Sequence, residues 1–255
     1  MDADILEYYD RGGEDTRLAD SVELLRTKVL LQRHLPENAK VLDVGGGSGV
    51  YATWLAEQGH RVRLVDPVPR HVATAREKGI DAVEGDARAL REPDAGHDAV
   101  LLLGPLYHLL DRADRVRALT EAGRVSRDLV VAAVISRWSP MFEGMLRGLV
   151  DHPGFTPMLR EDLTSGTRRG TQHHPYGFTT CYFHRPEEIV SEVADAGLTL
   201  VDLLPVEGMA HWIPDVADRL ADPDKRALLL ELLERTEREP ALLGATAHLL
   251  VIARR

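Results

Sequence analysis

The chain has 255 residues, of which 44% are hydrophobic and 28% charged, a balance typical of one large globular α/β domain. Its formal net charge of −10 repels nucleic acid and anionic membrane surfaces, so neither is expected as a partner. No apolar run approaches the roughly 20 residues that span a bilayer. Cys181 is the single cysteine, which excludes an internal disulfide and favours a cytoplasmic location.

The first part of the chain predicts helix followed by alternating strands and helices. Residues 1–35 are expected to be helical up to Pro36, because Leu24, Leu25, Val29 and Leu31 nearly follow a helical period. Beyond them, short apolar strands alternate with amphipathic helices, which predicts βαβ units and a parallel sheet. The expected strands are residues 41–44, 62–65, 82–84, 99–103 and 129–135, and the expected helices are residues 50–58, 71–78 and 114–125.

Residues 137–185 interrupt this alternation. They are rich in Pro, Gly, Thr and His, and are interpreted as an insertion. The expected elements beyond them are helices at 187–196, 214–220 and 224–238 and strands at 198–204 and 246–252. Because a long helical stretch separates these two strands, the last is expected to lie antiparallel beside the sixth. The predicted fold is a Rossmann-like, doubly wound α/β sheet of seven strands with the last one antiparallel.

Residues 41–49, with the sequence VLDVGGGSG, run from a strand through glycines into a helix. Glycines there allow positive φ and expose backbone N–H groups to a ligand at a helix N-terminus. A phosphate-binding P-loop is excluded, because no lysine stands between Lys40 and Lys78. A dinucleotide fingerprint is disfavoured, because Val50 stands where its third glycine or alanine belongs. The remaining pattern is D-x-G-x-G-x-G, led by Asp43.

This pattern resembles the first motif of the class I S-adenosylmethionine-dependent methyltransferases, a strand ending in (V/L)LD(V/L)GxGxG. The resemblance implies that Asp66, at the end of the second strand, accepts hydrogen bonds from both ribose hydroxyls of S-adenosylmethionine. A carboxylate suits a cis-diol because each oxygen can take one O–H. Asp86 is implied at the adenine amino group, and Leu103 with Gly104 at the methionine moiety and the methyl group. The implied cofactor-binding residues are Asp43, Gly45, Gly47, Gly49, Asp66, Pro67, Asp86, Ala87, Leu103 and Gly104.

Within the family, the sequence is most similar to small bacterial enzymes that carry Tyr-Tyr-Asp near the start and Gly-Pro-Leu-Tyr-His-Leu after the fourth strand. Residues 8–10 and 104–109 match these motifs. The sequence departs from the family at residues 125–128, where a Pro-Gly-Gly-type turn is usual. DNA amino-methyltransferases begin the loop after the fourth strand with Asp or Asn, whereas Gly104 stands there, so a nucleobase substrate is not expected.

Three residues are candidates for the catalytic chemistry. His108 is the best candidate for a base, because an imidazole titrates near neutrality and this one follows the fourth strand. Tyr107 precedes it, and Tyr9 belongs to a segment that often folds over the cofactor in the family. Two structural alternatives stay open: His108 can cap or pack the following helix, and Tyr9 can pack the N-terminal helix onto the sheet.

The insertion concentrates rings and imidazoles that the rest of the chain lacks. Trp138 and Phe142 fall on one face of an expected helix, a pattern that suits either a core or a pocket wall. The histidines of residues 173–184 match no zinc spacing, so no metal site is expected. We expect a polar-aromatic lid over the substrate. Its candidate substrate-binding residues are Trp138, Phe142, His174, Tyr182 and His184.

The sequence therefore predicts a single domain that transfers a methyl group from S-adenosylmethionine to O or N of a small-molecule metabolite. Its expected parts are an N-terminal helical lid segment (1–37), a cofactor-binding core (38–136), a lid insertion (137–185) and the rest of the core (186–255). Two alternatives keep the cofactor: a non-methylating rearrangement or decarboxylation, and a non-catalytic regulator. A nicotinamide oxidoreductase is the weakest alternative, and no pattern indicates an oligomeric state.

Overall fold

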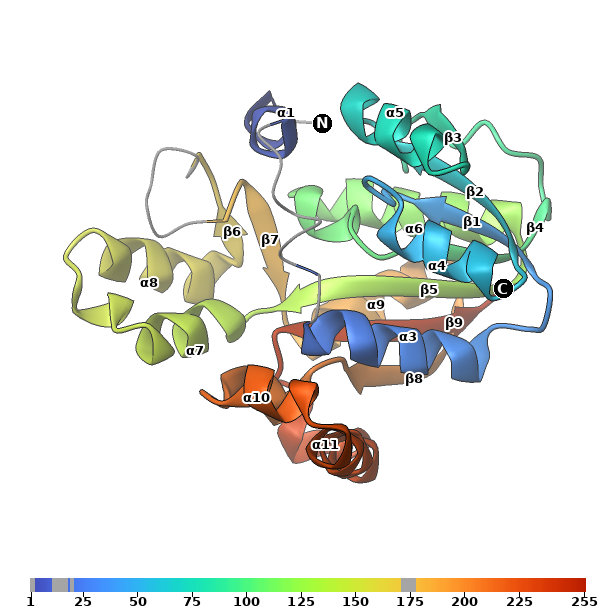
Figure 1. The fold of residues 1–255 in the computed structure, drawn as a ribbon. Coiled ribbons are helices and arrows are strands. Elements are labelled where there is room, and N and C mark those ends of the chain that lie inside the picture. Colours follow the sequence, from blue (N-terminus) through green and yellow to red (C-terminus); the bar gives the residue numbers. More distant parts are fainter. Residues whose placement is uncertain (1–2, 11–17, 19–20, 171–177) are drawn as a thin grey trace.

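The computed structural model describes residues 3–10, 18, 21–170 and 178–255 and has a mixed β-sheet at its centre (Figure 1). Five strands are parallel, in the order β3, β2, β1, β4 and β5. β9 then lies antiparallel between β5 and β8, which confirms the predicted antiparallel last strand. These strands are β1 (Lys40–Val44), β2 (Arg61–Asp66), β3 (Asp81–Glu84), β4 (His97–Leu102), β5 (Ser126–Ser136), β8 (Thr199–Pro205) and β9 (His248–Arg254).

Two further strands extend the sheet beyond the seven that were predicted. The end of β5 pairs in parallel with β7 (Cys181–His184), so that Ile135 stands opposite Phe183. β7 in turn pairs antiparallel with the short β6 (Thr167–Arg168). Both strands come from residues 137–185, so part of the predicted lid is built into the sheet. Cys181 and Phe183 pack on Ile135, and this burial anchors the insertion.

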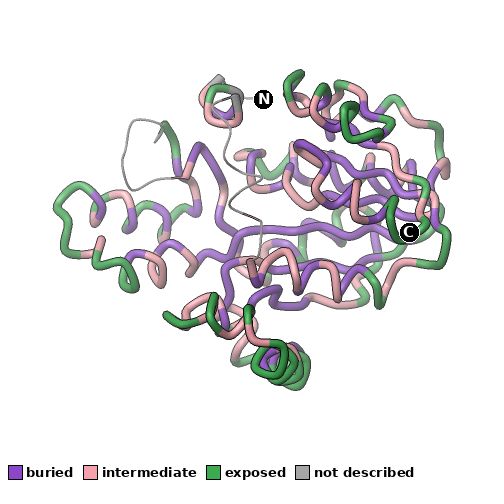
Figure 2. The backbone as a smooth tube through the Cα atoms, in the orientation of Figure 1, coloured by how far each residue is buried: buried purple, intermediate pink, exposed green. Residues whose placement is uncertain are grey.

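Helices cover both faces of the sheet (Figure 2). Successive side chains along each strand point to opposite faces. Along β1, Leu42 and Val44 face α6 and α9, whereas Val41 faces α3 and α4. The buried residues follow the central strands, and the exposed ones lie on the outer helices. The covering helices are α3 (Val22–His34), α4 (Val50–Glu57), α5 (Pro69–Glu77), α6 (Arg112–Val125) and α9 (Pro186–Asp195).

In the described part of the N-terminal segment, α1 (Ala3–Asp10) and α3 are separate helices where the sequence predicted one. α1 lies near the carboxyl edge of the parallel strands, apart from α3 (Figure 1). α3 begins anew because the Ser21 hydroxyl caps it by accepting a hydrogen bond from the Leu24 N–H (3.0 Å). The Thr179 hydroxyl donates to the Asp4 carbonyl (3.4 Å), and Ile5 is buried. These contacts hold α1 against the segment that leads into β7.

The remaining elements lie around the carboxyl edge of the sheet and on one flank (Figure 1). Within the described residues, no helix combines the length and the apolar character needed to cross a bilayer. The helices that follow β5 pack on each other because Gly144 allows the Phe155 ring to approach closely. The remaining helices and turns are η1 (Leu106–His108), α7 (Ser139–Leu146), η2 (Leu149–Asp151), α8 (Phe155–Ser165), η3 (Gly208–Trp212), α10 (Val216–Ala221), α11 (Pro223–Thr236) and η4 (Pro240–Leu242).

Candidate active site

A cavity opens beyond the carboxyl ends of β1, β2 and β4, where an open α/β sheet binds its ligands. Twelve of the residues predicted as cofactor-binding or catalytic line it. They are Tyr9, Asp43, Gly45, Gly47, Asp66, Pro67, Asp86, Ala87, Leu103, Gly104, Tyr107 and His108. Gly49 is a predicted residue that does not line the cavity. It adopts φ +86° and serves as the N-cap of α4 directly behind the cavity wall.

The glycine turn brings two stretches of backbone together at the base of the cavity. Gly45 adopts φ +70°, a conformation that disfavours side chains, and a Cβ there would lie 2.8 Å from Cδ of Pro105. A Cβ at Gly104 would lie 3.1 Å from the carbonyl oxygen of Gly45. The Gly45 N–H donates to the Val65 carbonyl (2.6 Å), which ties the turn to β2. Both glycines are therefore required for the close approach of these loops.

The Asp66 carboxylate is fixed in the cavity by three donors. Oδ2 accepts from the Gly47 N–H (2.9 Å), and Oδ1 accepts from the Val68 N–H (2.9 Å). The Nδ1 atom of His71 lies 3.1 Å from Oδ1 and is the donor, since a carboxylate oxygen can only accept. A carboxylate offers about four lone-pair sites, so these bonds leave room for a ligand hydroxyl. Asp66 is thus oriented as an acceptor for a ligand hydroxyl in the cavity.

Asp43 is a buried carboxyl group without a partner. It is fully buried at the end of β1, and within the described residues neither of its side-chain oxygens has a hydrogen-bond partner. Burial, assisted by the nearby negative charge of Asp66, raises the pKa of Asp43 from an ordinary 3.8 to about 7. An unsatisfied polar group next to a cavity is costly unless a ligand satisfies it. Asp43 therefore points to a ligand that carries donors or positive charge.

Asp86 binds a neighbouring arginine inside the cavity wall. Its Oδ2 accepts from a terminal nitrogen of Arg88 (2.6 Å), and its Oδ1 accepts from the Arg88 N–H and Nε (both 2.9 Å). These hydrogen bonds lower the pKa of Asp86 and keep it ionised. Arg88 also pairs with Asp114 at the start of α6 (2.6 Å). The carboxylate is therefore held in place as an acceptor beside Ala87.

Tyr9 and His108, 99 positions apart in the chain, form a hydrogen-bonded pair in the cavity. The Nδ1 atom of His108 lies 3.2 Å from the Thr180 carbonyl oxygen, which can only accept, so Nδ1 carries the proton. Nε2 is then the acceptor, and the Tyr9 hydroxyl donates to it across 2.7 Å. The Thr180 carbonyl thereby fixes the tautomer that a general base requires. His108 is 8% exposed and is held by these bonds.

Aromatic rings surround this pair. The ring of Tyr9 meets that of His108 edge-on at 5.3 Å, and Tyr107 meets His108 at 4.7 Å. Phe178, which precedes β7, lies 5.7 Å from the His108 ring and 5.4 Å from the ring of Tyr8. α1, η1 and the segment before β7 each contribute rings. This part of the cavity wall is therefore largely aromatic, and its polar groups include the hydroxyls of Tyr9 and Tyr107 and the imidazole of His108.

Two predicted substrate-binding residues lie outside the cavity, which corrects the sequence analysis. His184 is fully buried in the sheet, and its Nε2 lies 3.3 Å from the Glu192 carboxylate on α9. Burial lowers the pKa of His184. Tyr182 stacks on Arg115, whose guanidinium carbon lies 3.8 Å from the ring centre, and accepts a hydrogen bond from Arg137 (3.2 Å). Both side chains anchor β7 to neighbouring elements instead of lining this cavity.

The expected aromatic face of the first insertion helix also points elsewhere. Trp138 packs against Gly244, where a Cβ would lie 2.9 Å from the indole ring. Phe142 stacks on Trp212 of η3 with ring centres 5.0 Å apart. Neither residue lines the cavity, so this face packs on the C-terminal part of the chain and is not a substrate wall. His174, the remaining predicted residue, lies outside the described residues.

The cavity also contains residues that the sequence analysis did not single out. His71 contacts Asp66 from the first turns of α5, and its place five residues after the strand-end acid was the signal that could have revealed it. Arg88 was similarly indicated by its place next to Asp86 and Ala87. Glu23 and Tyr51 line the cavity from α3 and α4. They carried no such signal, because an acid in the first turn of a helix and a tyrosine on its buried face are common.

Comparison with known proteins agrees with this geometry. A family model described as "Methyltransferase domain" matches residues 41–128, from β1 to the start of β5. The ubiquinone biosynthesis O-methyltransferase of Methylocella silvestris is 32% identical over 195 residues, which cover 64% of this chain and 75% of that protein. A human protein named as a probable tRNA methyltransferase 9B is 32% identical over 100 residues, covering 39% of this chain and 21% of that protein.

Solved structures share the fold at low sequence identity. The methyltransferase in a complex with the Trm112 methyltransferase activator of Haloferax volcanii matches with a TM-score of 0.63, 18% identity and coverage of 100% of this chain and 99% of that one. The 1,6-didemethyltoxoflavin-N1-methyltransferase of Burkholderia thailandensis, solved with its substrate and S-adenosylhomocysteine, matches with a TM-score of 0.55, 20% identity and coverage of 98% and 84%.

Fold and cavity together define a class I methyltransferase. The chain belongs to the S-adenosylmethionine-dependent methyltransferase family, and its cofactor is S-adenosylmethionine. The cavity fits this cofactor: the glycine turn offers bare backbone, Asp66 offers an oriented carboxylate, and Asp43 is a buried carboxyl group that lacks a partner. A ligand that is cationic at its sulfonium and ammonium groups suits this acidic cavity.

Proposed function

We propose that this methyltransferase acts on an oxygen or nitrogen atom of a small-molecule metabolite. The single observation that carries the proposal is the Tyr9–His108 pair beside the cofactor cavity, enclosed by aromatic rings. When bound, S-adenosylmethionine supplies a sulfonium methyl group that is already activated for displacement, so no covalent protein intermediate is required. The work left to the chain is to bind, to orient and to remove a proton from the acceptor.

The hydrogen bonds define a path for that proton. The Tyr9 hydroxyl donates to Nε2 of His108, and in the proposed complex the Tyr9 oxygen accepts from a hydroxyl or ammonium group of the bound acceptor. As the acceptor proton passes to Tyr9, the Tyr9 proton passes to Nε2, and an imidazolium forms. Its Nδ1–H remains bonded to the Thr180 carbonyl. Tyr9 and His108 thus act as a two-residue relay, in which His108 is the base.

The shape of this part of the cavity favours an acceptor with a ring or another apolar portion. Tyr107 and His108 from η1 and Tyr9 from α1 present ring faces and edges to the same space. Such surfaces stabilise aromatic ligands through edge-to-face contacts and burial. The net charge of −10 and the partly apolar wall favour a metabolite over a nucleic acid. The match to a tRNA methyltransferase makes RNA the alternative that an experiment must exclude.

Labelling with S-adenosylmethionine carrying a radioactive methyl group tests this proposal. The protein is incubated separately with a low-molecular-weight metabolite extract and with bulk tRNA. We expect label in the metabolite fraction. With unlabelled cofactor, we expect a product 14 mass units heavier than its acceptor (about the mass of CH₂) and one demethylated cofactor per product. The Tyr9→Phe variant should label the same product more slowly. Label confined to tRNA, or label that does not depend on Tyr9 and His108, would contradict the proposal.

A further inference from the structure

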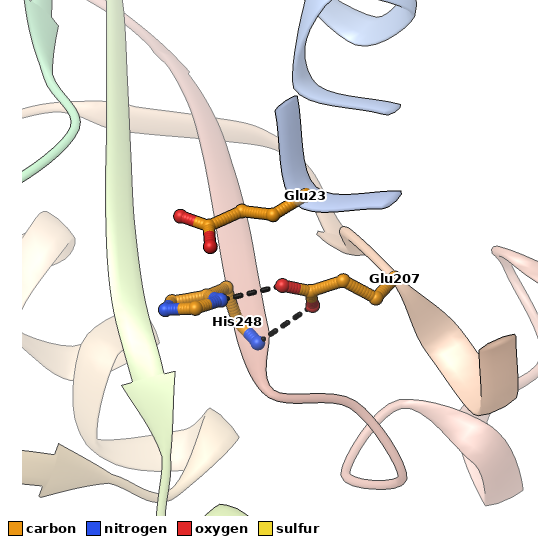
Figure 3. A group of neighbouring side chains, drawn as sticks. All are labelled: Glu23, Glu207 and His248. Carbon is orange, nitrogen blue, oxygen red and sulfur yellow. Dashed lines mark hydrogen bonds and ion pairs between the residues drawn. The ribbon is translucent and has the colours of Figure 1, made fainter. Parts of the chain in front are cut away.

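Three potential metal ligands meet at the wall of the cofactor cavity. Glu23 on α3, Glu207 after β8 and His248 at the start of β9 each direct one ligand atom into a common space (Figure 3). These two carboxylate oxygens and one imidazole nitrogen all lie within 4.8 Å of one another. Glu23 also lines the cofactor cavity, so the cluster borders the space in which the methyl acceptor is proposed to bind.

The cluster is held in place by surrounding hydrogen bonds. Glu207 is fully buried and lies 2.5 Å from Nδ1 of His248 through one oxygen. Its other oxygen accepts from the Thr246 hydroxyl and from the His248 N–H, both at 2.9 Å. Thr246 in turn accepts from the Gly208 N–H (3.1 Å). Such supporting bonds orient ligands before a metal arrives and sharpen its coordination.

The chemistry of the three donors favours a cation. Nδ1 of His248 donates its proton to Glu207 in the metal-free protein, so a divalent ion would displace this proton and itself neutralise the two neighbouring carboxylates. The mixed set of two oxygens and one imidazole nitrogen suits Zn²⁺ or Mn²⁺, whereas Mg²⁺ prefers oxygen ligands alone. Three protein ligands leave at least one coordination position for water or substrate, as in catalytic zinc sites. The donors come from three separate elements, so the fold itself assembles them.

We propose that Glu23, Glu207 and His248 bind a divalent transition-metal ion, and that this ion binds an oxygen atom of the methyl acceptor. The first half differs from the sequence-based expectation of no metal and stands independently of the acceptor. The second half rests on the proposed function, and it restricts the acceptor to molecules with an oxygen donor near the methylated atom. An ion there would hold that oxygen at the side of the cavity formed by α3.

Metal titration of the chelator-treated protein tests the site. Calorimetry with Zn²⁺ should show one saturable site per chain, and Mg²⁺ should bind at least tenfold more weakly. Glu23→Gln should weaken Zn²⁺ binding at least tenfold, because it removes a charged ligand that is only partly buried. Glu37→Gln removes the same charge from an exposed carboxylate in the turn between α3 and β1, and should leave the affinity unchanged. His248→Gln is the second variant. Zn²⁺ should raise the melting temperature of the wild type but not that of His248→Gln.

The outcomes separate this inference from the proposed function. S-adenosylhomocysteine is titrated into the same metal-free and Zn²⁺-loaded samples. No saturable Zn²⁺ binding, or equal affinity in wild type and Glu23→Gln, would overturn the metal site and leave the methyl transfer untouched. If both variants abolish Zn²⁺ binding but an acceptor is labelled without the metal, the metal site stands. The proposed contact between the ion and the acceptor would then be wrong.

Discussion

Replacement of Asp66 by asparagine should weaken cofactor binding without disrupting the fold. The substitution keeps the shape of the side chain but removes its charge and one of its two acceptor oxygens. The bonds from the Gly47 and Val68 N–H groups exist in the free protein, so their loss lowers stability and not affinity. Affinity depends on the bonds that the bound ribose makes. A hydrogen bond to a charged group contributes about 1.5–3 kcal/mol, and an asparagine oxygen can retain part of it.

We therefore expect Asp66→Asn to lose about 1–3 kcal/mol of binding free energy, a fall of about 5- to 150-fold in affinity. Calorimetric titration with S-adenosylhomocysteine at 25 °C measures it directly. Asp224→Asn, on the exposed first turn of α11, removes the same charge far from the cavity and should bind like wild type. Equal affinities for Asp66→Asn and wild type, in variants that remain folded by circular dichroism, would refute the assignment of Asp66 to the ribose.

Three further predictions concern the rest of the cavity. In urea unfolding, Gly45→Ala should destabilise the protein by about 1–3 kcal/mol more than Gly197→Ala. Both positions have positive φ, but a Cβ at Gly45 also meets the ring of Pro105. Equal losses of stability would contradict the close approach of Gly45 to Pro105. His108→Gln should lower kcat about 10²- to 10⁴-fold while S-adenosylhomocysteine affinity stays within about twofold, and Tyr9→Phe should act in the same direction; unchanged turnover would remove the relay. The pKa of Asp43 is about 7 in the folded state and 3.8 in the unfolded state. Between these pH values Asp43 is protonated in the folded protein but ionised in the unfolded chain, so the free energy of unfolding falls as the pH rises from about 4 to 7. The free energy of unfolding of Asp43→Asn should not show this fall, so it should rise relative to that of the wild type by up to about 1.4 kcal/mol per pH unit in that range. Parallel pH profiles of stability for the two proteins would contradict the burial of an uncompensated carboxyl group.

The central strands and the cofactor side of the cavity could be predicted because their signals are local. A strand that runs into glycines, with an acid at its end, specifies its own turn, and parallel strands bring Asp43 and Asp66 to the same edge of the sheet. The substrate side depends on contacts between distant segments. Tyr9 meets His108 only because α1 returns across the sheet edge, and the Thr180 carbonyl that orients His108 has no sequence signal at all.

The errors have the same origin. The rings and imidazoles of the insertion were assigned to a lid because they cluster in the sequence, but β7 carries Tyr182 and His184 into the sheet. There His184 pairs with Glu192 and the ring of Tyr182 stacks on Arg115, so both side chains have partners within the fold. The grouping of Glu23, Glu207 and His248 could not be read from the sequence, because these residues come from three separate elements that meet only in the folded chain.

A crystal structure of the protein with S-adenosylhomocysteine would show directly whether this cavity binds the cofactor. The account predicts one nucleoside in the cavity, with its ribose hydroxyls within hydrogen-bond distance of Asp66 and its thioether sulfur beside Gly104, facing the Tyr9–His108 pair. A cavity that stays empty at saturating ligand, or a nucleoside bound elsewhere on the molecule, would contradict it.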